Sequence, residues 1–414
     1  MLKVYARTPL VARIVGAMVI GIVLGVVLQQ LPEGSRKAFA DNLKLIAGIV
    51  LKLLRLLATP LIFLAVLHAL MTKPMQGRQA GRLLTILMTN TAIAVLIGLG
   101  VANLLRPGQH ISLAGPAAAP TNRPYSITED LIGKLPESVG GPFATNDILG
   151  LIALAIGFGL ALRQVRTTHS EGFTVLERGL DALYAGVMVL LKWVLELVPI
   201  AVLCVVSRIV GTEGVGLLLK MLWFVVAVVV ALALMVGVYL ARLRFQTKLS
   251  VPRFFAGVSE ALLLAFSTAS SAATLPVTYR CATQKLGVKE ESASLGIMVG
   301  GTFNHDGTAL YEAMAALFIS QALGRSLGLG EQAVVVLMAI VAGVGAAGIP
   351  EAGLVTMLAV FTAVGLPVEY IPLLLPLDWF LDRCRTTINV LGDLVSTCVV
   401  DAGLPPTLAH DRGP

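Results

Sequence analysis

Charged residues are scarce in this sequence. They make up 13% of the 414 residues, whereas soluble domains carry about 25%, and 57% of the residues are hydrophobic. The net charge of +7 does not indicate a nucleic-acid partner, because no aromatic residues are interleaved with the Lys and Arg residues. The four cysteines lack the paired spacing of a metal site and are expected to be small buried hydrophobes. They are Cys204, Cys281, Cys384 and Cys398. No nucleophile–base spacing appears, so we expect neither an enzyme nor a cofactor.

Long apolar runs fill most of the first 241 residues and are candidates for membrane-spanning helices, which need about 20 residues. They lie at Leu10–Leu31, Leu43–Met71, Leu83–Leu105, Asp147–Leu162, Leu180–Val210 and Val215–Ala241. The basic segment before the first run has no evident small-residue cleavage site. We therefore expect a retained first helix and not a signal peptide.

Basic residues concentrate in every second break between these runs. They are Lys3, Arg7 and Arg13, then Lys73, Arg78 and Arg82, then Arg163 and Arg166, and finally Arg242, Arg244, Lys248 and Arg253. Because basic loops remain on the cytoplasmic side, alternating helices place the N-terminus in the cytoplasm. The polar stretch Pro107–Asn146 is then an external loop.

Two later segments have apolar halves of only about a dozen residues, too short to span a membrane. In Pro252–Leu286 the halves flank the polar stretch from Ser267 to Ser271, and in Gln332–Val364 they flank a glycine-rich stretch. This pattern predicts two re-entrant helical hairpins. Such a pair is typical of the binding site of a secondary transporter, where non-helical backbone lines a cavity.

Five polar residues near the C-terminus share one helical stripe, because they are spaced by three or four residues. They are Asp378, Asp382, Arg385, Asn389 and Asp393. A charge at the bilayer centre costs at least about 2.5–3.5 kcal/mol, so the stripe must face protein, water or a ligand. Both a ligand site and an internal salt-bridge network meet this requirement, and Asp378 suits the second.

The sequence from Asn304 to Thr308, Asn-His-Asp-Gly-Thr, interrupts an otherwise apolar helix over 292–323. Asn and Asp beside Gly favour local unwinding, which exposes the carbonyl oxygens that a dehydrated Na⁺ requires. Glu312 lies one turn later and is either a proton carrier or a neutral core residue, because a carboxyl group in low dielectric can take up a proton. His305 is a second titratable candidate, or a satisfied core imidazole.

Charge matching predicts the ligand. A bidentate arginine suits a carboxylate and an aspartate suits an ammonium group. Arg385 and Asp382 therefore fit the side-chain carboxylate and the α-amino group of one acidic amino acid. The hydroxyl groups of Ser270 and Ser271 and the Asn389 amide would take the main-chain carboxylate.

These motifs resemble those of the glutamate/aspartate transporter family, the dicarboxylate/amino acid:cation symporters that include the excitatory amino acid transporters. The resemblance runs through most of the chain and is strongest over 265–397. It is carried by Ser-Ser-Ala-Ala-Thr-Leu-Pro at 270–276, Asn-His-Asp-Gly-Thr at 304–308, Gly-Ala-Ala-Gly-Ile-Pro at 345–350 and the run 378–393.

The resemblance implies an all-α polytopic membrane protein with eight transmembrane helices, two re-entrant hairpins and inverted repeats. It implies a homotrimer that works as an elevator in the plasma membrane (the inner membrane of a prokaryote), with both termini cytoplasmic. Scaffold regions would be 1–75 (helices 1–2) and 107–213 (helices 4–5, trimerisation). Transport regions would be 76–106 (helix 3) and 214–405 (helix 6 to helix 8 with both hairpins), before a tail at 406–414.

The resemblance also implies site residues. The substrate contacts carried over are Ser270, Ser271, Thr308, Ile349, Gly353, Asp382, Arg385, Thr386 and Asn389. Glu312 matches the family's proton-carrying glutamate. Arg383, with Ala269 at the first hairpin tip, resembles members that place a second arginine on the last helix.

Three sodium sites are implied and match unevenly. The first uses Gly300, Asn304, Asn389 and Asp393. The second involves a methionine that is His305 here, although Thr302 is kept. The third uses a Tyr, a Thr and a Ser of the third helix, which are Leu87, Asn90 and Thr91 here, with Asn304 and Asp306. We therefore expect symport of glutamate and/or aspartate with H⁺, Na⁺ or both. A C4-dicarboxylate symporter is the alternative, and an anion channel is a further one.

Overall fold

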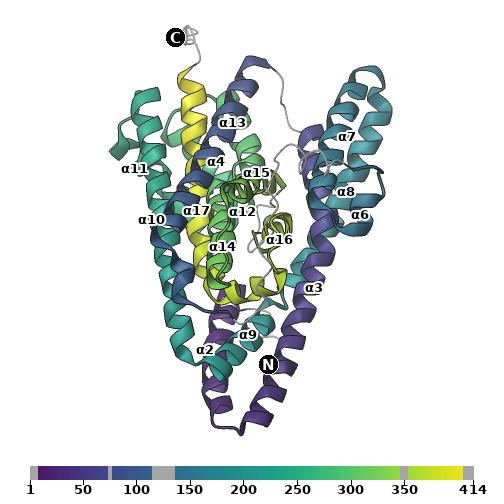
Figure 1. Ribbon diagram of the computed structural model, residues 1–414. Helices are drawn as coiled ribbons and strands as arrows, with labels where there is room; N and C mark the ends of the chain where they lie inside the picture. Colours follow the sequence, from purple (N-terminus) through teal and green to yellow (C-terminus); the bar gives the residue numbers. More distant parts are fainter. Residues whose placement is uncertain (1–7, 73–76, 114–135, 346–352, 404–414) are drawn as a thin grey trace, which may run out of the picture.

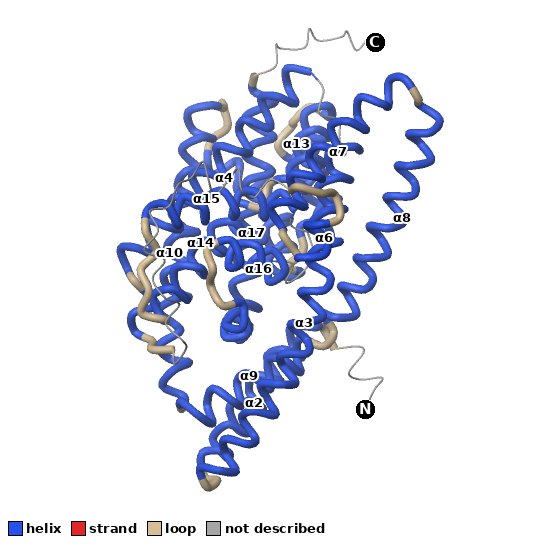
Figure 2. Tube along the Cα trace, turned by 45° about the vertical axis from the view of Figure 1, so that its right-hand side comes forward, coloured by secondary structure: helices blue, strands red, loops and turns tan. Residues whose placement is uncertain are grey.

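The computed structural model describes residues 8–72, 77–113, 136–345 and 353–403, and within these ranges all regular structure is helical. Figure 2 shows the helices joined by loops, most of them short, with no strand among the described residues. The all-α class expected from the sequence is confirmed.

Among the described residues, the N-terminal half contributes six long helices and two short ones (Figure 1). They are α2 (Leu10–Gln29), α3 (Glu33–Thr72), α4 (Gly77–Leu105), η1 (Pro107–His110), α6 (Gly141–Thr145), α7 (Ile148–Thr168), α8 (Ser170–Leu195) and α9 (Val198–Glu213). The C-terminal half begins with α10 (Val215–Gln246), α11 (Val251–Thr268), α12 (Ser271–Arg280) and the π-helical η2 (Cys281–Lys285). It continues with α13 (Glu290–Phe303), α14 (Asp306–Ala322), α15 (Leu329–Gly345), α16 (Gly353–Ala363), η3 (Val368–Leu374) and α17 (Leu375–Ala402).

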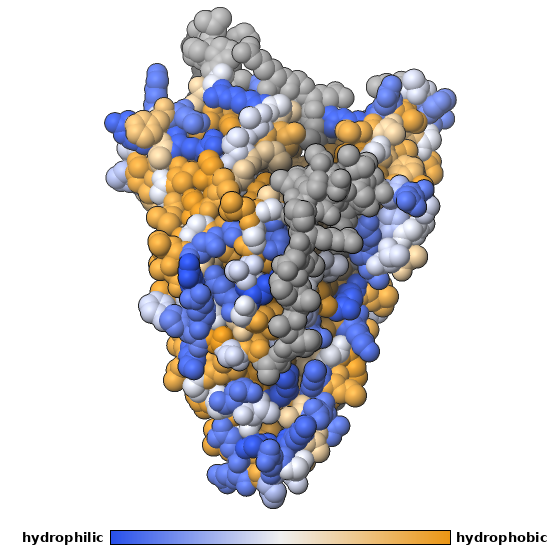
Figure 3. Space-filling model, in the orientation of Figure 1, coloured by the Kyte–Doolittle hydropathy of each residue, from blue (hydrophilic) through white to orange (hydrophobic). Residues whose placement is uncertain are grey.

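Several of these helices are suited to a lipid bilayer, which makes this a multi-pass membrane protein. Five helical stretches of the described residues are long and apolar enough to cross a membrane. They are Ala12–Gln29, Glu33–Met71, Gln79–His110, Ser170–Glu213 and Val215–Gln246. Figure 3 shows apolar residues over much of the side of the molecule, where a lipid-facing surface lies. The count of eight spanning helices remains a prediction.

Some expected boundaries differ from those in the structure. The second helix begins at Glu33 and not at Leu43, because its polar first turns are helical although they are not apolar. The run Leu180–Val210 is two helices that meet at Glu196 and Leu197, just before Pro199, which lacks an N–H group for a continuous helix. The described ends of the expected external loop form η1 and α6.

Both expected hairpins have two helical arms that pack against each other, α11 with α12 and α15 with α16. The first turn is made by Ala269, whose backbone is left-handed at φ 50°, and by Ser270. The Ser270 hydroxyl caps α12 by accepting a hydrogen bond from the Ala273 N–H at 3.2 Å. The second tip, 346–352, lies outside the described residues.

The helices pack in two groups. α3 contacts α7, α8 and α9, and α2 lies along α9. In the second group α17 contacts α10, α11, α13 and α14, while α4 lies against α14 and α10. α17 therefore runs through the interior of the second group, which explains how its polar stripe avoids lipid. The division into a scaffold and a moving transport domain remains a prediction.

Two glycines allow α2 to approach α9 closely. A Cβ atom at Gly21 would lie 3.0 Å from the Leu203 carbonyl oxygen, and one at Gly25 would overlap Val210. Small residues at such contacts let helix backbones approach each other within a membrane.

We expect Gly25→Ala to lower the thermal unfolding midpoint of the purified protein by several degrees, because overpacking costs about 1–3 kcal/mol. Gly16→Ala on the same helix is the matched control, since a Cβ atom there meets nothing within 4 Å. Both variants replace glycine by alanine in the same helix, so the gain in helix propensity cancels when their midpoints are compared. Equal midpoints for the two variants would contradict the close α2–α9 contact.

Candidate functional site

The five-residue stripe on α17 is buried, and none of its members is more than 6% exposed. Arg385 lies at its centre and donates two hydrogen bonds along the helix. Its Nη1 reaches Asp378 Oδ1 at 2.7 Å, and its Nη2 reaches Asp382 Oδ1 at 2.8 Å. The guanidinium is thus held between two carboxylates, which compensate its charge in a membrane interior.

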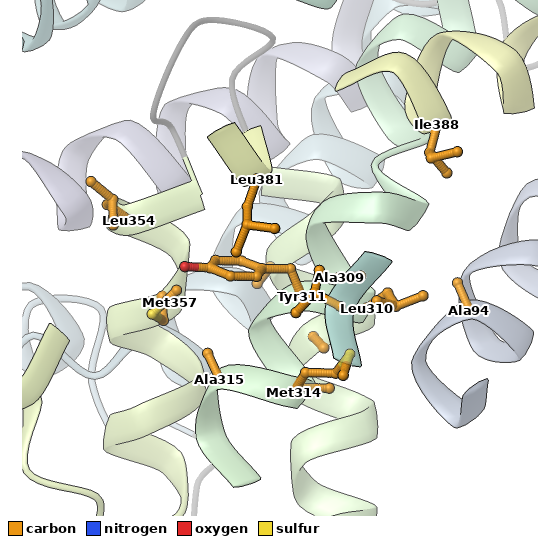
Figure 4. Close-up of a cluster of buried hydrophobic side chains, with 14 of the residues drawn as sticks. Ala94, Ala309, Leu310, Tyr311, Met314, Ala315, Leu354, Met357, Leu381 and Ile388 are labelled. Carbon is orange, nitrogen blue, oxygen red and sulfur yellow. The ribbon is translucent and has the colours of Figure 1, made fainter. Parts of the chain in front are cut away.

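Tyr311 of α14 forms one wall of this arrangement. The Arg385 guanidinium carbon lies 3.9 Å from the centre of the Tyr311 ring, a cation–π contact. Figure 4 shows the ring extending from α14 among apolar side chains that include Leu381 of α17 and Met357 of α16. Tyr311 was not predicted from the sequence, although its position three residues after Thr308 places both on one face of α14.

The break between α13 and α14, which the Asn-His-Asp-Gly-Thr motif predicted, lies directly against α17. Asn304 ends α13, and its Nδ2 donates to the Asn389 carbonyl oxygen at 3.0 Å and to Asp393 Oδ1 at 2.9 Å. The Gly307 N–H donates to Asn389 Oδ1 at 2.8 Å, and Asn389 Nδ2 donates to Thr308 Oγ1 at 3.3 Å. The structure therefore brings Asn304, Thr308, Asn389 and Asp393 together.

Two predicted glycines lie within this cluster, and at Gly300 a side chain would not fit without a shift of Asp393. A Cβ atom at Gly300 would lie 3.1 Å from the Asp393 carboxyl carbon. One at Gly353, the first residue of α16, would lie 3.3 Å from Thr308 Cγ2 and 3.5 Å from Arg385 Nη2. The arm of the second hairpin thus begins beside the Arg385 guanidinium.

The carboxylate of Asp306 joins three helices at a second point of the cluster. Thr91 Oγ1 of α4 donates to its Oδ1 at 2.6 Å, and the Tyr239 hydroxyl of α10 donates to its Oδ2 at 2.5 Å. The Leu87 carbonyl oxygen is also 3.0 Å from Thr91 Oγ1. Tyr239 was missed by the sequence analysis, because nothing near it in the chain indicates a polar partner.

Two amide oxygens beside Asp306 are buried without a hydrogen-bond donor among the described residues. They are Asn90 Oδ1 and Asn304 Oδ1, although the Asn90 Nδ2 donates to Ser396 Oγ at 3.3 Å. Buried polar atoms are rarely left unpaired without a reason such as an ion. The resemblance implies a tyrosine at the position of Leu87. The backbone carbonyl oxygen of Leu87 is present whatever the side chain, so it is still available as a ligand.

Glu312 is fully buried on α14. One of its carboxyl oxygens accepts a hydrogen bond from Thr356 Oγ1 of α16, and Oε2 has no partner among the described residues. His305 is buried against α15, where a Cβ atom at Gly343 would lie 3.9 Å from His305 Cβ. Thr356 is a further contact that spacing alone did not indicate.

The remaining predicted site residues are Ser270, Ser271, Thr386, Thr302 and Ile349. Ser270, Ser271 and Thr386 are buried, at the first hairpin tip and on α17. Thr302 is half-buried, and its hydroxyl donates to the Met298 carbonyl oxygen of its own helix at 3.2 Å. Ile349 lies outside the described residues.

The sequence matches the sodium:dicarboxylate symporter family over residues 10–402, nearly the whole chain. The chain belongs to this family. It is 31% identical over 446 residues to excitatory amino acid transporter 2 of Mus musculus, an alignment that covers 92% of this chain and 77% of the relative. It is 40% identical over 270 residues to excitatory amino acid transporter 4 of Rattus norvegicus, with 64% of this chain and 47% of the relative covered. Excitatory amino acid transporter 1 of Homo sapiens is 38% identical over 278 residues, with coverage of 66% and 50%.

Arg383 fixes the first hairpin to α17 in this symporter. Its Nη1 donates to the carbonyl oxygens of Phe266 at 2.5 Å and of Ser267 at 2.6 Å, in the last turn of α11. A cation at a helix C-terminus also meets the negative end of the helix dipole. The arginine thus holds the Ser270–Ser271 tip close to the buried stripe.

Proposed function

We propose that this chain is a secondary active symporter that carries glutamate and/or aspartate across a membrane, coupled to H⁺, Na⁺ or both. The observation that carries the proposal is a fully buried arginine, Arg385, which lies between two carboxylates and beside the first residue of α16. Membership of a symporter family and similarity to excitatory amino acid transporters support the substrate class.

In this proposal Arg385 binds the side-chain carboxylate of the substrate, and Asp382 binds its ammonium group. In the structure Asp382 accepts a hydrogen bond from Arg385. When the substrate binds, this pair is replaced by two others, one between Arg385 and the substrate carboxylate and one between Asp382 and the substrate ammonium group. Asp378 stays with Arg385 and keeps one arginine bond in place. The remaining contacts are proposed at the two hairpin tips and on the facing helices: Ser270, Ser271, Thr308, Ile349, Gly353, Thr386 and Asn389.

Competition for uptake distinguishes this proposal from C4-dicarboxylate symport. We expect liposomes with the purified protein to take up labelled aspartate, and unlabelled glutamate or aspartate should suppress that uptake, whereas succinate should not. Succinate has both carboxylates but lacks the ammonium group that Asp382 is proposed to bind. Suppression by succinate at the same concentration as aspartate would favour the dicarboxylate substrate.

The cations are proposed to lie on both sides of the α13–α14 break. One Na⁺ would bind at Gly300, Asn304, Asn389 and Asp393. Another would bind at Asn90, Thr91, Asn304 and Asp306, where two buried amide oxygens have no donor among the described residues. Carboxylate, amide, hydroxyl and carbonyl oxygens are the ligands of a hard cation. A further site at Thr302 and His305 would differ from these because an imidazole replaces the methionine of the family motif.

Glu312 is proposed as the proton carrier, with His305 as the second candidate. We expect Glu312→Gln to abolish uptake driven by an inward proton gradient, because an amide cannot bind and release a proton. Glu260→Gln, at an exposed site on α11 where Glu260 pairs with Lys285, is the control and should behave as wild type. If a proton gradient drives uptake equally in Glu312→Gln and wild type, Glu312 is not the carrier.

The family resemblance further supports a homotrimer that works by elevator motion, with scaffold regions 1–75 and 107–213 and transport regions 76–106 and 214–405. We propose that it resides in the plasma membrane, the inner membrane of a prokaryote, with both termini in the cytoplasm. Basic residues in alternate breaks between the apolar runs support this orientation.

A further inference from the structure

A second cavity lies away from the stripe on α17. It has a volume of about 570 Å³, is open on one side, and is bordered by α3, by the end of α6 and by the segment that joins α16 to η3. Its polar lining residues are Arg55, Thr59, Thr145, Asn146, Thr362 and Glu369. Ligand cavities for small molecules have volumes of about 300–1,000 Å³, so this one is large enough for an amino acid.

The hydroxyl groups that line this cavity, which we call the seam cavity, already donate to acceptors. Thr145 and Thr362 donate to backbone carbonyl oxygens of their own helices, at 3.0 and 2.7 Å. Thr59 Oγ1 donates to Asn146 Oδ1 at 2.6 Å, which fixes the Asn146 amide and leaves its NH₂ group facing away from that bond. Asn146 also has a left-handed backbone, at φ 54°.

Three groups of the cavity therefore remain uncommitted. The Arg55 guanidinium, the Asn146 NH₂ group and the Glu369 carboxylate have no hydrogen bond or ion pair with any residue that the structure describes. Arg55 and Glu369 line one cavity but do not pair with each other. The two donors, Arg55 and Asn146, belong to α3 and to the end of α6, and the acceptor, Glu369, belongs to η3.

The position of Arg55 makes this arrangement informative. It interrupts the apolar sequence of α3, with leucines on both sides at 53–54 and 56–57. An ionisable residue within a membrane helix is costly, and it usually faces a water-filled cavity and marks a path for substrate or ions. An unpaired arginine that lines a cavity opposite an unpaired glutamate fits a ligand that carries both charges.

We propose that the seam cavity binds a second zwitterionic amino acid, with its carboxylate on Arg55 and Asn146 and its ammonium group on Glu369. The choice of aspartate or glutamate as this ligand rests on the proposed function. The site is separate from Arg385, because Gly353 and Thr362 are about 14 Å apart along α16. An occupant touches α3 on one side and the segment after α16 on the other, and so holds the second hairpin arm to α3.

Equilibrium binding of labelled L-aspartate to the purified protein tests this site. Wild type should show a tight and a weak component. Arg55→Gln should weaken the weak component at least about tenfold and leave the tight one unchanged, because it removes hydrogen bonds to a charged group. Lys52→Gln, one turn earlier on α3 and outside the cavity, is the matched control and should keep both components. Arg385→Lys should remove only the tight one.

The outcomes separate this inference from the proposed function. A weak component that survives Arg55→Gln, or its absence in wild type, overturns the second site and leaves the first intact. If the wild-type protein binds no aspartate at all, both the second site and the proposed function are overturned. Glu369→Gln should weaken aspartate at the weak site but not succinate, which lacks the ammonium group; equal effects overturn the role of Glu369. Phosphoethanolamine, a probe for a zwitterionic lipid headgroup, should displace the weak component less well than aspartate, and stronger displacement overturns the amino-acid assignment.

Discussion

Replacing Arg385 by lysine should reduce the rate of aspartate uptake about a hundredfold. Lysine keeps the positive charge that compensates Asp378 and Asp382, so the fold of α17 should tolerate the change. It cannot reproduce the planar pair of N–H groups that now reaches both carboxylates at 2.7 and 2.8 Å. A hydrogen bond to a charged group is worth about 1.5–3 kcal/mol, so the loss of two corresponds to at least about a hundredfold.

The control for this variant is Arg280→Lys on the first hairpin, where the arginine pairs with Glu260 at an exposed site. Its uptake should match wild type, since exposed ion pairs contribute little. Size-exclusion profiles and thermal midpoints of both variants show whether they are folded. A folded Arg385→Lys protein with uptake within about threefold of wild type would mean that this arginine does not bind the substrate.

Replacing Asp306 by asparagine should strongly weaken the response of the protein to Na⁺. The carboxylate is the only charged group in the proposed site with Asn90, Thr91 and Asn304, and it joins α4, α10 and α14 through two hydroxyl donors. Asparagine keeps the size and one acceptor oxygen, so packing is preserved while the charge that attracts the cation is lost. We expect the Na⁺ concentration for half-maximal uptake to rise at least about a hundredfold.

A measurement independent of transport supports this test. Na⁺ should raise the thermal midpoint of the wild-type protein, because an ion that binds only the folded state stabilises it, and should raise that of Asp306→Asn less. Asp401→Asn near the end of α17, where the carboxylate accepts a hydrogen bond from the Lys289 N–H, is the control and should keep the Na⁺ response. Equal Na⁺ responses in Asp306→Asn and wild type would rule out a cation at Asp306.

Much of the architecture could be predicted because it depends on local spacing. The stripe on α17 follows from helical periodicity, and the break at Asn304 follows from Asn, Asp and Gly in one short segment. The first hairpin was predictable because its apolar halves are too short to span a bilayer. Helix ends were less predictable: the polar first turns of α3 continue a helix that hydropathy alone begins later.

The partners of the buried carboxyl groups could not be predicted, because they are brought in by tertiary packing. Thr91 and Tyr239 reach Asp306 from 215 and 67 residues away in the sequence. Thr356 reaches Glu312 only because α16 packs on α14. Tyr311 resembles any core aromatic residue until α17 places a guanidinium over its ring. The seam cavity likewise combines residues from α3, α6 and η3, which share no sequence motif.

The most direct test of the central claim is uptake of labelled aspartate into liposomes that hold the purified protein, with Na⁺ and pH gradients imposed separately. We expect uptake above that of protein-free liposomes under at least one inward gradient, and its loss in Arg385→Lys under that same gradient. The absence of aspartate and glutamate uptake under every Na⁺ or H⁺ gradient would contradict it.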